Sequence, residues 1–397
     1  MPQTSFTRWL LLPELEWEEK ETGLAPSGAR NVIPCVKQSD LEVCPRCATP
    51  STATYDHRRI RVKDAPIRGK LIWLEIRKRR FWCKTCHRPF TEPVPGIAPR
   101  RRTTERYRAE ILWACERFSD LKSVRAAYQC SNRFLYHVFN ERLDLEIRKR
   151  QDPWPTTIGI DEHSFQKRKT GPLPFVSLIA DYNRKRVLDL VPGKTQVDME
   201  RYLAHIPERE NVRQVVIDLT DGYRNFVQSF FPRALLIADK FHVLRLLHGA
   251  INRHRKEITG DRRSLVIRKL LLKSGYTLDP FTQFAVWSWL DQHPNLKELY
   301  SWKERLHGFY RIKGYHRAKR ALYAMLDAMA ASLLPEIQTL RRTLRRWRYE
   351  ILNYFSCNGL TNARTEGYNN KAKVIKRRAY GYRNFENYRR RVLCACY

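Results

Sequence analysis

Three carboxylates have the residue types and surroundings of a site for phosphodiester chemistry. Asp161 and Asp218 each follow a short apolar run. Glu366 lies in a basic stretch, since residues 341–397 contain 15 Lys and Arg but only three acids. Mg²⁺ prefers hard oxygen ligands on rigid elements, and two such ions can activate one oxygen and stabilise another. We therefore expect Asp161, Asp218 and Glu366 to meet at a site for two Mg²⁺ (or Mn²⁺) ions.

A carboxylate at a strand end can also be an ordinary cap or turn residue, so neighbouring positions need comparison. Asp221 competes with Asp218 as the second aspartate, but Asp218 stands directly at the predicted strand end. Glu162 and His163 follow Asp161, and we expect them to face away from the site or to support it from behind. The prediction therefore requires a fold that brings carboxylates from distant parts of the chain close together.

Two CxxC pairs, Cys44/Cys47 and Cys83/Cys86, have the spacing of metal knuckles. Four thiolates can hold one tetrahedral Zn²⁺. The bound metal then stabilises a segment that is too short to form a hydrophobic core. The alternatives are two unrelated cysteine pairs or a redox site. The intervening residues fit a hairpin with its turn near Arg68–Lys70. The spacing predicts a zinc ribbon over residues 44–92.

The carboxylates require a sheet that brings strand ends together. Short apolar runs bounded by turn signals predict five strands with helices after the third and the fourth. The predicted strands are Ile158–Phe165, Phe175–Asp181, Val187–Val191, Arg213–Ile217 and Ala234–Ala238, and the predicted helices are Thr195–Ile206 and Tyr223–Phe231. The order β-β-β-α-β-α-β gives a mixed sheet in which the first and fourth strands can be neighbours, which would join Asp161 to Asp218.

The third carboxylate is expected from a helix near the end of the sequence. Residues 243–355 have a helical pattern throughout. We therefore predict an α-helical insertion between the sheet and this helix. Thr361 or Asn362 would cap the helix. Glu366, Asn369, Asn370 and Lys373 would then share one polar face, and Gly367 would allow close approach to another backbone.

Residues 103–150 contain three short helical patterns flanked by Arg and Lys, as in a helix-turn-helix. Ser119 and Asp120 would cap the second helix, and the third would begin at Ser131. Arg133, His137 and Arg142 on the third helix are then candidates for DNA contact. The alternative is an ordinary three-helix connector.

The net charge indicates the kind of molecule that the protein binds. The formal net charge of +34 requires an anionic counterpart, and nucleic acid fits it. Double-stranded DNA is the form that the predicted helix-turn-helix would bind. No apolar run approaches a membrane span and no signal-peptide pattern is present, so we expect a cytoplasmic protein without membrane contact. Residues 1–43 are more acidic than the remainder, and we interpret them as a lead-in segment with little chemistry.

Together these motifs resemble the DDE transposases, and more closely the ISL-three group of bacterial insertion-sequence transposases. The resemblance rests on IGIDEHSF with Asp161, VIDLTDGY with Asp218, DKFHV with Asp239 and His242, TEGYNNKAKVIKRRAYGY with Glu366, and the CPRC and CKTC knuckles. It implies a ribonuclease-H-like core, a catalytic metal-binding triad of Asp161, Asp218 and Glu366, and cut-and-join chemistry on terminal inverted repeats. Asp239 and His242 match a DxxH signature of the related Mutator-like group, where this pair supports the site or contacts DNA.

The resemblance also implies further DNA contacts beside Glu366. The expected residues are Asn369, Asn370, Lys373, Lys376, Arg377 and Arg378. A solvated helix face is the alternative for them. Because two element ends must be handled together, a homodimer or larger assembly on DNA is expected.

The fold class expected is a multidomain α+β or α/β protein. Its parts would be a lead-in segment (1–43), a zinc ribbon (44–92), a helix-turn-helix (103–150), a ribonuclease-H-like core (155–242 and 356–397) and an α-helical insertion (243–355). Two other functions remain open on the residues alone. A non-catalytic DNA-binding regulator would keep the zinc, helices and charge, and a nuclease of the same fold would cleave without joining.

Overall fold

The chain divides into two compact units, which are described separately. The computed structural model describes residues 10–18, 31–117, 120–148, 152–166, 174–261 and 265–396. The first unit comprises Met1–Leu145 and Arg378–Tyr380, and the second comprises Glu146–Arg377 and Gly381–Tyr397. No helix among the described residues is both long and apolar enough to cross a membrane.

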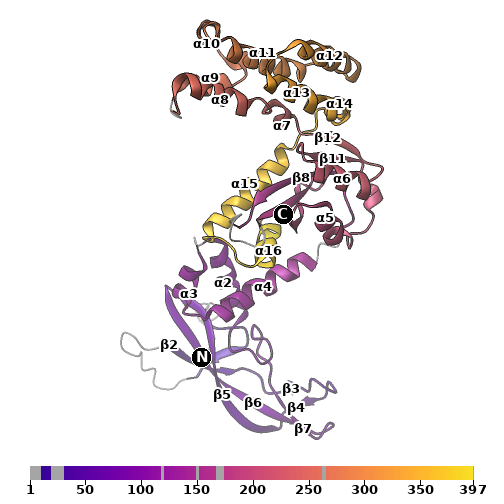
Figure 1. Cartoon of the computed structure of the whole chain (residues 1–397). Coiled ribbons are helices and arrows are strands. Elements are labelled where there is room, and N and C mark those ends of the chain that lie inside the picture. Colours follow the sequence, from indigo (N-terminus) through magenta and orange to yellow (C-terminus); the bar gives the residue numbers. More distant parts are fainter. Residues whose placement is uncertain are drawn as a thin grey trace. The chain divides into compact units, whose positions relative to one another are not determined.

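The first unit contains a five-stranded sheet built around a long hairpin (Figure 1). Its strands are β1 (Leu15–Trp17), β2 (Asn31–Lys37), β5 (Thr54–Ile67), β6 (Lys70–Cys83) and β7 (Arg88–Thr91), and a separate pair is β3 (Glu42–Val43) with β4 (Pro50–Ser51). The hairpin turns at Arg68 and Gly69, whose positive φ angles of 49° and 75° suit a tight two-residue turn. This is the turn that the sequence predicted.

The interpretation of residues 1–43 as a lead-in segment is wrong for the part that the structure describes. β1 pairs with β2, and β2 pairs in parallel with β6, so both strands belong to the main sheet. Leu15 and Cys35 are buried in its core. The pairing was missed because a parallel contact with β6 leaves no local signal. Residues 1–9 and 19–30 lie outside the described part.

Three helices follow the hairpin where the sequence predicted them. They are α2 (Glu105–Arg117), α3 (Leu121–Tyr128) and α4 (Asn132–Arg148). Of the two predicted cap residues, Asp120 caps α3 by accepting the Ser123 backbone N–H, and Ser119 lies outside the described residues. Asp64 of β5 accepts a hydrogen bond of 2.7 Å from Thr104, just before α2. The helices are therefore fixed to the sheet, and their role in reading DNA remains a prediction.

The second unit is organised around a mixed five-stranded sheet in the order β10-β9-β8-β11-β12. Its strands are β8 (Thr157–Ser164), β9 (Phe175–Asp181), β10 (Arg186–Pro192), β11 (Gln214–Ile217) and β12 (Leu235–Ala238). β8, β11 and β12 run parallel, whereas β9 and β10 run antiparallel to their neighbours. The prediction that the first and fourth strands are neighbours is confirmed, since Val216 of β11 pairs with Gly159 of β8.

Helices cover both faces of this sheet, because alternate strand residues are apolar on each side. α5 (Gln196–Leu203) and α6 (Asp221–Phe230) pack with Ile158 and Ile160 on one face. α15 (Ala363–Arg378) and α16 (Phe385–Ala395) pack with Val176 and Leu178 on the other. α16 was not predicted, although Tyr388 and Val392 stand one helical turn apart and are buried.

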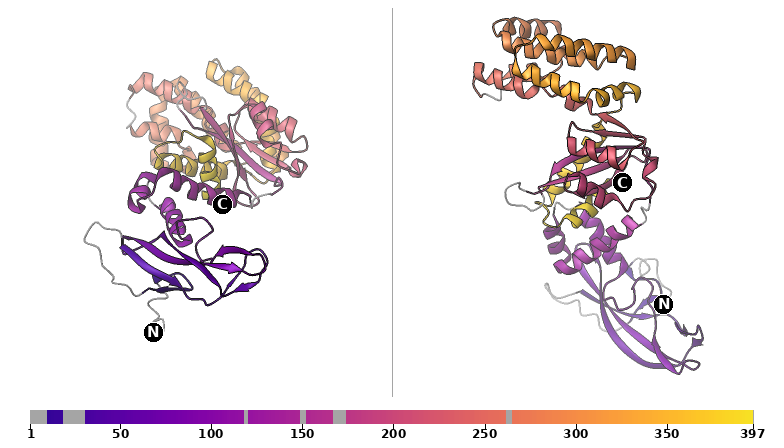
Figure 2. Two further views of the ribbon diagram at one scale, coloured as in Figure 1. Left: turned by 90° about the horizontal axis from the view of Figure 1, so that it is seen from below. Right: turned by 45° about the vertical axis from the view of Figure 1, so that its right-hand side comes forward.

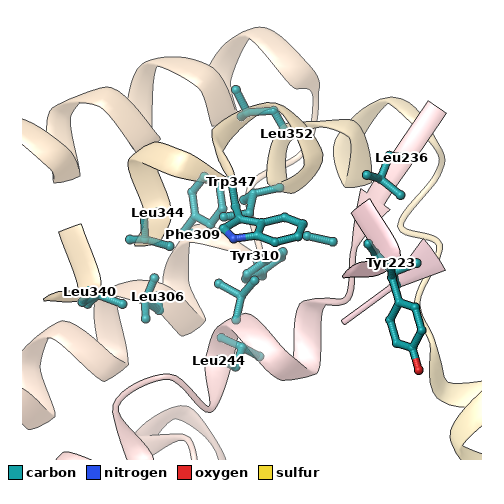
Figure 3. Packing of buried hydrophobic residues seen from close by; sticks show 14 of the residues in the cluster. Tyr223, Leu236, Leu244, Leu306, Phe309, Tyr310, Leu340, Leu344, Trp347 and Leu352 are labelled. Atoms are coloured by element: carbon teal, nitrogen blue, oxygen red, sulfur yellow. The ribbon is translucent and has the colours of Figure 1, made fainter. Parts of the chain in front are cut away.

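The segment between β12 and α15 is helical, as predicted, and its colour runs from red to yellow-orange in Figure 2. Its helices are α7 (Lys240–Leu244), α8 (His248–Thr259), α9 (Val266–Leu272), α10 (Pro280–Asp291), α11 (Pro294–Phe309), α12 (Tyr315–Ala328), α13 (Pro335–Arg346) and α14 (Arg348–Ser356). Short 3-10 turns lie within this segment at Gly275–Thr277 and Met329–Ala331, and another lies between α5 and β11 at Arg209–Asn211. Trp347, Phe309 and Leu244 share a hydrophobic cluster with Leu236 of β12 (Figure 3). This cluster joins the helical segment to the sheet.

Candidate active site

Two aspartates meet where β8 and β11 lie side by side. Asp161 lies within β8, and Asp218 comes directly after β11. Carboxylate oxygens of Asp161, Glu162 and Asp218 all lie within 4.8 Å of one another. The predicted pairing of Asp161 with Asp218 is therefore present in the structure. Glu162 is also part of this group, contrary to the expectation that it faces away.

Burial and the nearby charge of Asp218 together raise the pKa of Asp161 to about 7, although hydrogen bonds to its carboxylate oppose the shift. These bonds come from the Glu162 backbone N–H at 2.8 Å and from the Asn369 Nδ2 at 2.6 Å. Two carboxylates in a buried site repel each other unless a positive charge lies between them. The pair is thus suited to a bound cation.

His242 links Asp218 to Asp239. Its Nε2 lies 2.9 Å from Asp218 Oδ2, and its Nδ1 lies 3.0 Å from Asp239 Oδ2. Burial would lower the pKa of His242, but the two carboxylates outweigh it and raise the pKa to about 10. Asp239 also caps α7 by accepting the His242 backbone N–H. The two residues of the DxxH motif therefore lie beside the aspartate pair.

The start of α15 is held at the ends of the parallel strands. The Asn362 backbone N–H donates to Asp239 Oδ1 at 2.8 Å, and its Nδ2 donates to the Ile160 carbonyl at 3.1 Å. The same Nδ2 lies 3.4 Å from Asp218 Oδ1. The Tyr182 hydroxyl adds bonds to Asn362 and Thr365 at 3.3 and 2.9 Å. These residues fix α15 along β8, and no sequence motif indicated the role of Tyr182.

Asn369 holds Asp161 from the same helix. Its Oδ1 lies 2.9 Å from His163 Nδ1, and His163 Nε2 lies 2.7 Å from the Tyr388 hydroxyl of α16. Burial lowers the pKa of His163 to about 4, so the imidazole is neutral in this chain of bonds. His163 thus supports the site from behind, as expected. Tyr388 was missed because α16 was missed.

Glu366 lies on the helix face that carries both asparagines. Asn362 precedes it by four residues and Asn369 follows it by three, which places all three on one side of α15. Asn362 reaches Asp218 and Asn369 reaches Asp161. Glu366 itself is exposed, and among the described residues it is not in the group of close carboxylates around Asp161. The structure brings two members of the expected triad together and places the third on the adjoining helix face.

Gly159 permits the close approach of α15 to β8. A Cβ at this position would lie 2.1 Å from Thr365 Oγ1 and 2.7 Å from the Tyr182 hydroxyl oxygen. Gly367, the glycine expected to allow close approach, has open space around its Cβ position. The expectation was wrong because close approach depends on both partners, and only the strand side is crowded.

Gly159→Ala is therefore expected to push α15 away from β8 and to lower the free energy of unfolding by about 1–3 kcal/mol. Urea denaturation of the full chain measures this change. Gly367→Ala on the same helix is the matched control, and its effect should stay within about 1 kcal/mol, because a helical Gly-to-Ala change without a clash is mild. Equal effects of the two variants would contradict the crowding argument.

The DNA-binding residues expected on α15 differ in their surroundings. Asn369 is fully buried, so the expected DNA contact does not fit, and its amide positions Asp161. The Lys376 ammonium donates to the Phe165 carbonyl at 3.2 Å. Asn370, Lys373, Arg377 and Arg378 are exposed. DNA contact by these four remains a prediction.

Arg133, His137 and Arg142 are all exposed on α4. Arg133 and His137 are one turn apart and share a face. Arg142 is nine residues after Arg133, which at 3.6 residues per turn is the opposite side of the helix. The three predicted contacts therefore cannot all enter one groove from the same helix face.

The carboxylate group fits divalent metal. Asp161, Glu162 and Asp218 offer hard oxygen donors close together, as Mg²⁺ requires. Glu162 Oε2 is buried and has no hydrogen-bond partner among the described residues. A buried carboxylate oxygen without a partner is costly. A cation at this place would satisfy it.

The four predicted zinc ligands are brought together in the first unit. The sulfur atoms of Cys44, Cys47, Cys83 and Cys86 lie within 4.8 Å of one another. The first pair lies between β3 and β4, and in the second pair Cys83 ends β6 while Cys86 lies in the turn before β7. Apart from the cysteines, the hydrophobic cluster around them contains only two buried aromatic side chains, Phe81 and Phe90. This donor set and small core fit a structural Zn²⁺.

Comparison with known proteins identifies the family. A family model described as a transposase matches residues 158–392, and a second, described as the zinc-finger of transposase IS204/IS1001/IS1096/IS1165, matches residues 40–86. The first match spans more than half of the chain, so the chain belongs to this transposase family. It is a member of the ISL-three group of DDE transposases with an N-terminal zinc ribbon.

Two curated relatives are similar over most of their length. The transposase for insertion sequence element IS1001 of Bordetella parapertussis is 24% identical over 358 residues, covering 87% of this chain and 86% of that protein. The transposase for insertion sequence element IS1557 of Mycobacterium tuberculosis is 23% identical over 418 residues, covering 94% and 89%. A solved Drosophila P element transposase strand transfer complex covers 67% of this chain and 86% of that chain at 10% identity, with a TM-score of 0.33. A TM-score this low does not establish a shared fold.

Proposed function

We propose that this chain is a Mg²⁺-dependent (or Mn²⁺-dependent) DNA transposase with Asp161, Asp218 and Glu366 as its catalytic triad. The observation that carries the proposal is the meeting of Asp161 and Asp218 across adjacent parallel strands. Asn362 and Asn369 hold these two aspartates from the helix face on which Glu366 lies. We infer a ribonuclease-H-like core from the strand order and this carboxylate placement.

The reaction has two steps of the same kind. In the first, a water oxygen attacks phosphorus at an element end and the bond from phosphorus to the 3′ oxygen breaks, which leaves a 3′-hydroxyl and a 5′-phosphate. In the second, that 3′-hydroxyl attacks a target phosphodiester and displaces its 3′ oxygen. Two divalent ions bound to the triad would lower the barrier by stabilising charge on the attacking and leaving oxygens.

The surrounding residues keep the carboxylates in place. Asn369 and the Glu162 N–H occupy one oxygen each of Asp161, which limits its rotation. His242 and Asn362 do the same for Asp218. Positioning of this kind matters because small displacements of catalytic groups cost large factors in rate.

The remaining parts would recognise and hold DNA. In this proposal the zinc ribbon (44–92) and the helices of residues 103–150 bind the terminal inverted repeats. Exposed cations of α15 hold phosphates without reading sequence. The helical insertion (243–355) interrupts a core of residues 155–242 and 356–397. The protein would act in the bacterial cytoplasm as a homodimer or larger assembly on DNA.

The test uses DNA carrying the element's terminal repeats, with and without Mg²⁺. Native protein should nick at the element end and join the freed 3′ end to target DNA. Asp161→Asn and Glu366→Gln should bind the same DNA with native affinity but cleave it at most about one-thousandth as fast, since lost metal ligation removes several kcal/mol. Native protein that binds and never nicks would contradict the proposal, and nicking without joining would indicate a nuclease.

A further inference from the structure

An exposed surface of the helical insertion combines cations with tyrosine rings. It is formed by one side of α12, the end of α13 and the start of α14. Its residues are Lys319, Arg320, Tyr323, Arg345, Arg348 and Tyr349, and we name it the α12–α14 surface. None of these residues belongs to the carboxylate site.

The three helices present these side chains together. Lys319 and Arg320 precede Tyr323 by four and three residues, so they flank it on one face of α12. All three are exposed. α12 packs against α14, and Arg348 Nη1 of α14 donates to the Arg345 carbonyl of α13 at 2.8 Å. These contacts tie α12, α13 and α14 into one surface.

Tyr349 is arranged to stack with a planar group. The Arg348 guanidinium carbon lies 4.3 Å from the Tyr349 ring centroid, and Arg348 Nη2 lies 3.1 Å from its hydroxyl oxygen. The guanidinium therefore supports one side of the ring. Because Tyr349 is 56% exposed, ring surface remains for a ligand. A ring backed by arginine is a platform on which a base can stack.

The cations of this surface lack anionic partners. Within the described part of the chain, Lys319, Arg320, Arg345 and Arg348 form no ion pair with a carboxylate. Asp327, the one acid in the sequence of α12, stands near the end of that helix. Uncompensated positive charge on a fixed surface attracts a polyanion. Phosphates of a nucleic acid are the partner that also matches the rings.

The surface is fixed relative to the aspartate pair. Arg346, at the end of α13, pairs with Asp221 at 2.7 Å. Asp221 is the first residue of α6 and lies three residues after Asp218. A second ion pair of 2.6 Å joins Arg224 of α6 to Glu350 of α14. A DNA strand leaving the carboxylates along the start of α6 would meet this surface.

We propose that the α12–α14 surface binds the DNA strand next to the cleaved phosphodiester as unpaired nucleotides. Phosphates contact Lys319, Arg320 and Arg345, and a base stacks on Tyr349. Cations alone would suit a duplex equally well, but bases within a duplex are already stacked, so an open tyrosine face selects an unpaired one. The location of the strand rests on the proposed function.

Fluorescence anisotropy with the full chain tests this proposal without requiring the repeat sequence. The probes are a blunt DNA duplex and the same duplex with a single-stranded oligo(dT) extension. Tyr349→Ala should weaken binding of the extended probe about ten-fold, since stacking one base contributes about 1–3 kcal/mol. Binding of the blunt probe should not change. Tyr349→Phe keeps the ring and should retain native affinity for both.

Tyr276→Ala is the matched control. Tyr276 is 76% exposed, and the Arg311 guanidinium carbon lies 4.3 Å from its ring, so it repeats the arginine–tyrosine pair away from the α12–α14 surface. Its loss should leave both affinities unchanged. Replacing Arg320 and Arg345 with alanine should reduce the salt dependence of binding to the extended probe, by about 0.7 in logarithmic slope for each lost phosphate contact.

Several results would overturn the proposal. They are an equal loss on blunt and extended DNA, no loss with Tyr349→Ala, or the same loss with Tyr276→Ala. Circular dichroism of each variant checks that these exposed substitutions leave the fold intact. The readout is binding, so failure of native protein to nick DNA would refute the proposed function separately.

Discussion

Asp218→Asn is expected to reduce DNA cleavage at least about a thousand-fold, whereas Asp221→Asn should leave the rate within a few-fold of native. Asp218 lies in the group of carboxylates that includes Asp161, and its loss would remove several kcal/mol of charge stabilisation. Asp221 begins α6 and points to Arg346 instead. The measurement is single-turnover cleavage of terminal-repeat DNA in Mg²⁺.

The comparison is informative because the two aspartates are three residues apart and chemically identical. The Asp221–Arg346 pair is exposed, with side chains 49% and 60% accessible, and such pairs contribute at most about 1 kcal/mol to stability. Equal DNA affinity of native protein and both variants is the control for folding. If Asp221→Asn loses cleavage while Asp218→Asn keeps it, the second triad member has been assigned to the wrong residue.

Removal of zinc is expected to unfold the ribbon. Because few apolar side chains support the four cysteines, the metal supplies most of the local folding energy. In zinc-finger peptides that energy is about 10 kcal/mol or more. Cys83→Ser should reduce the metal content from about one zinc per chain to near zero. It should also remove hydrogen-exchange protection from β3, β4 and β7.

Cys130→Ser is the control for this experiment. Cys130 is partly buried in the first unit and does not belong to the four-cysteine group. Zinc content and exchange protection of the ribbon should match those of native protein. A Cys83→Ser chain that keeps both would exclude a structural role for the metal. Mass spectrometry of metal content and of deuterium uptake supplies both measurements.

The parts of the fold predicted correctly have local sequence signals. The CxxC spacing identifies the four cysteines, and the turn at Arg68–Lys70 fixes the hairpin. The apolar runs of the second unit end in Asp218 and Asp239, which identified both strand ends. The order of those runs allowed β8 and β11 to be neighbours, because the long connection between them permits a parallel pair.

The parts that were missed depend on contacts between distant residues. Nothing near Asn362 or Tyr182 indicates that they bind each other, or that Gly159 must leave room for both. Asn369 was predicted to lie on the protein surface because its helix is polar, yet its side chain is buried against β8. Glu162 was not predicted to belong to the site, because alternate residues of a strand face opposite sides. In the structure the carboxylates of both Glu162 and Asp161 lie close to that of Asp218. Such arrangements follow from tertiary packing, which periodicity does not record.

The hydrogen bonds of His163 also bear on the order in which the protein folds. They join it to Asn369 and Tyr388, which are 206 and 225 positions away in the chain. Contacts between such distant residues form late, since the entropy of closing a long loop must be overcome first. The hydrogen bond that joins the hairpin of the first unit to its helices, between Asp64 and Thr104, spans only 40 positions. A chain still emerging from the ribosome would therefore fold its first unit well before its carboxylates are assembled, which would delay any cutting activity until synthesis is nearly complete.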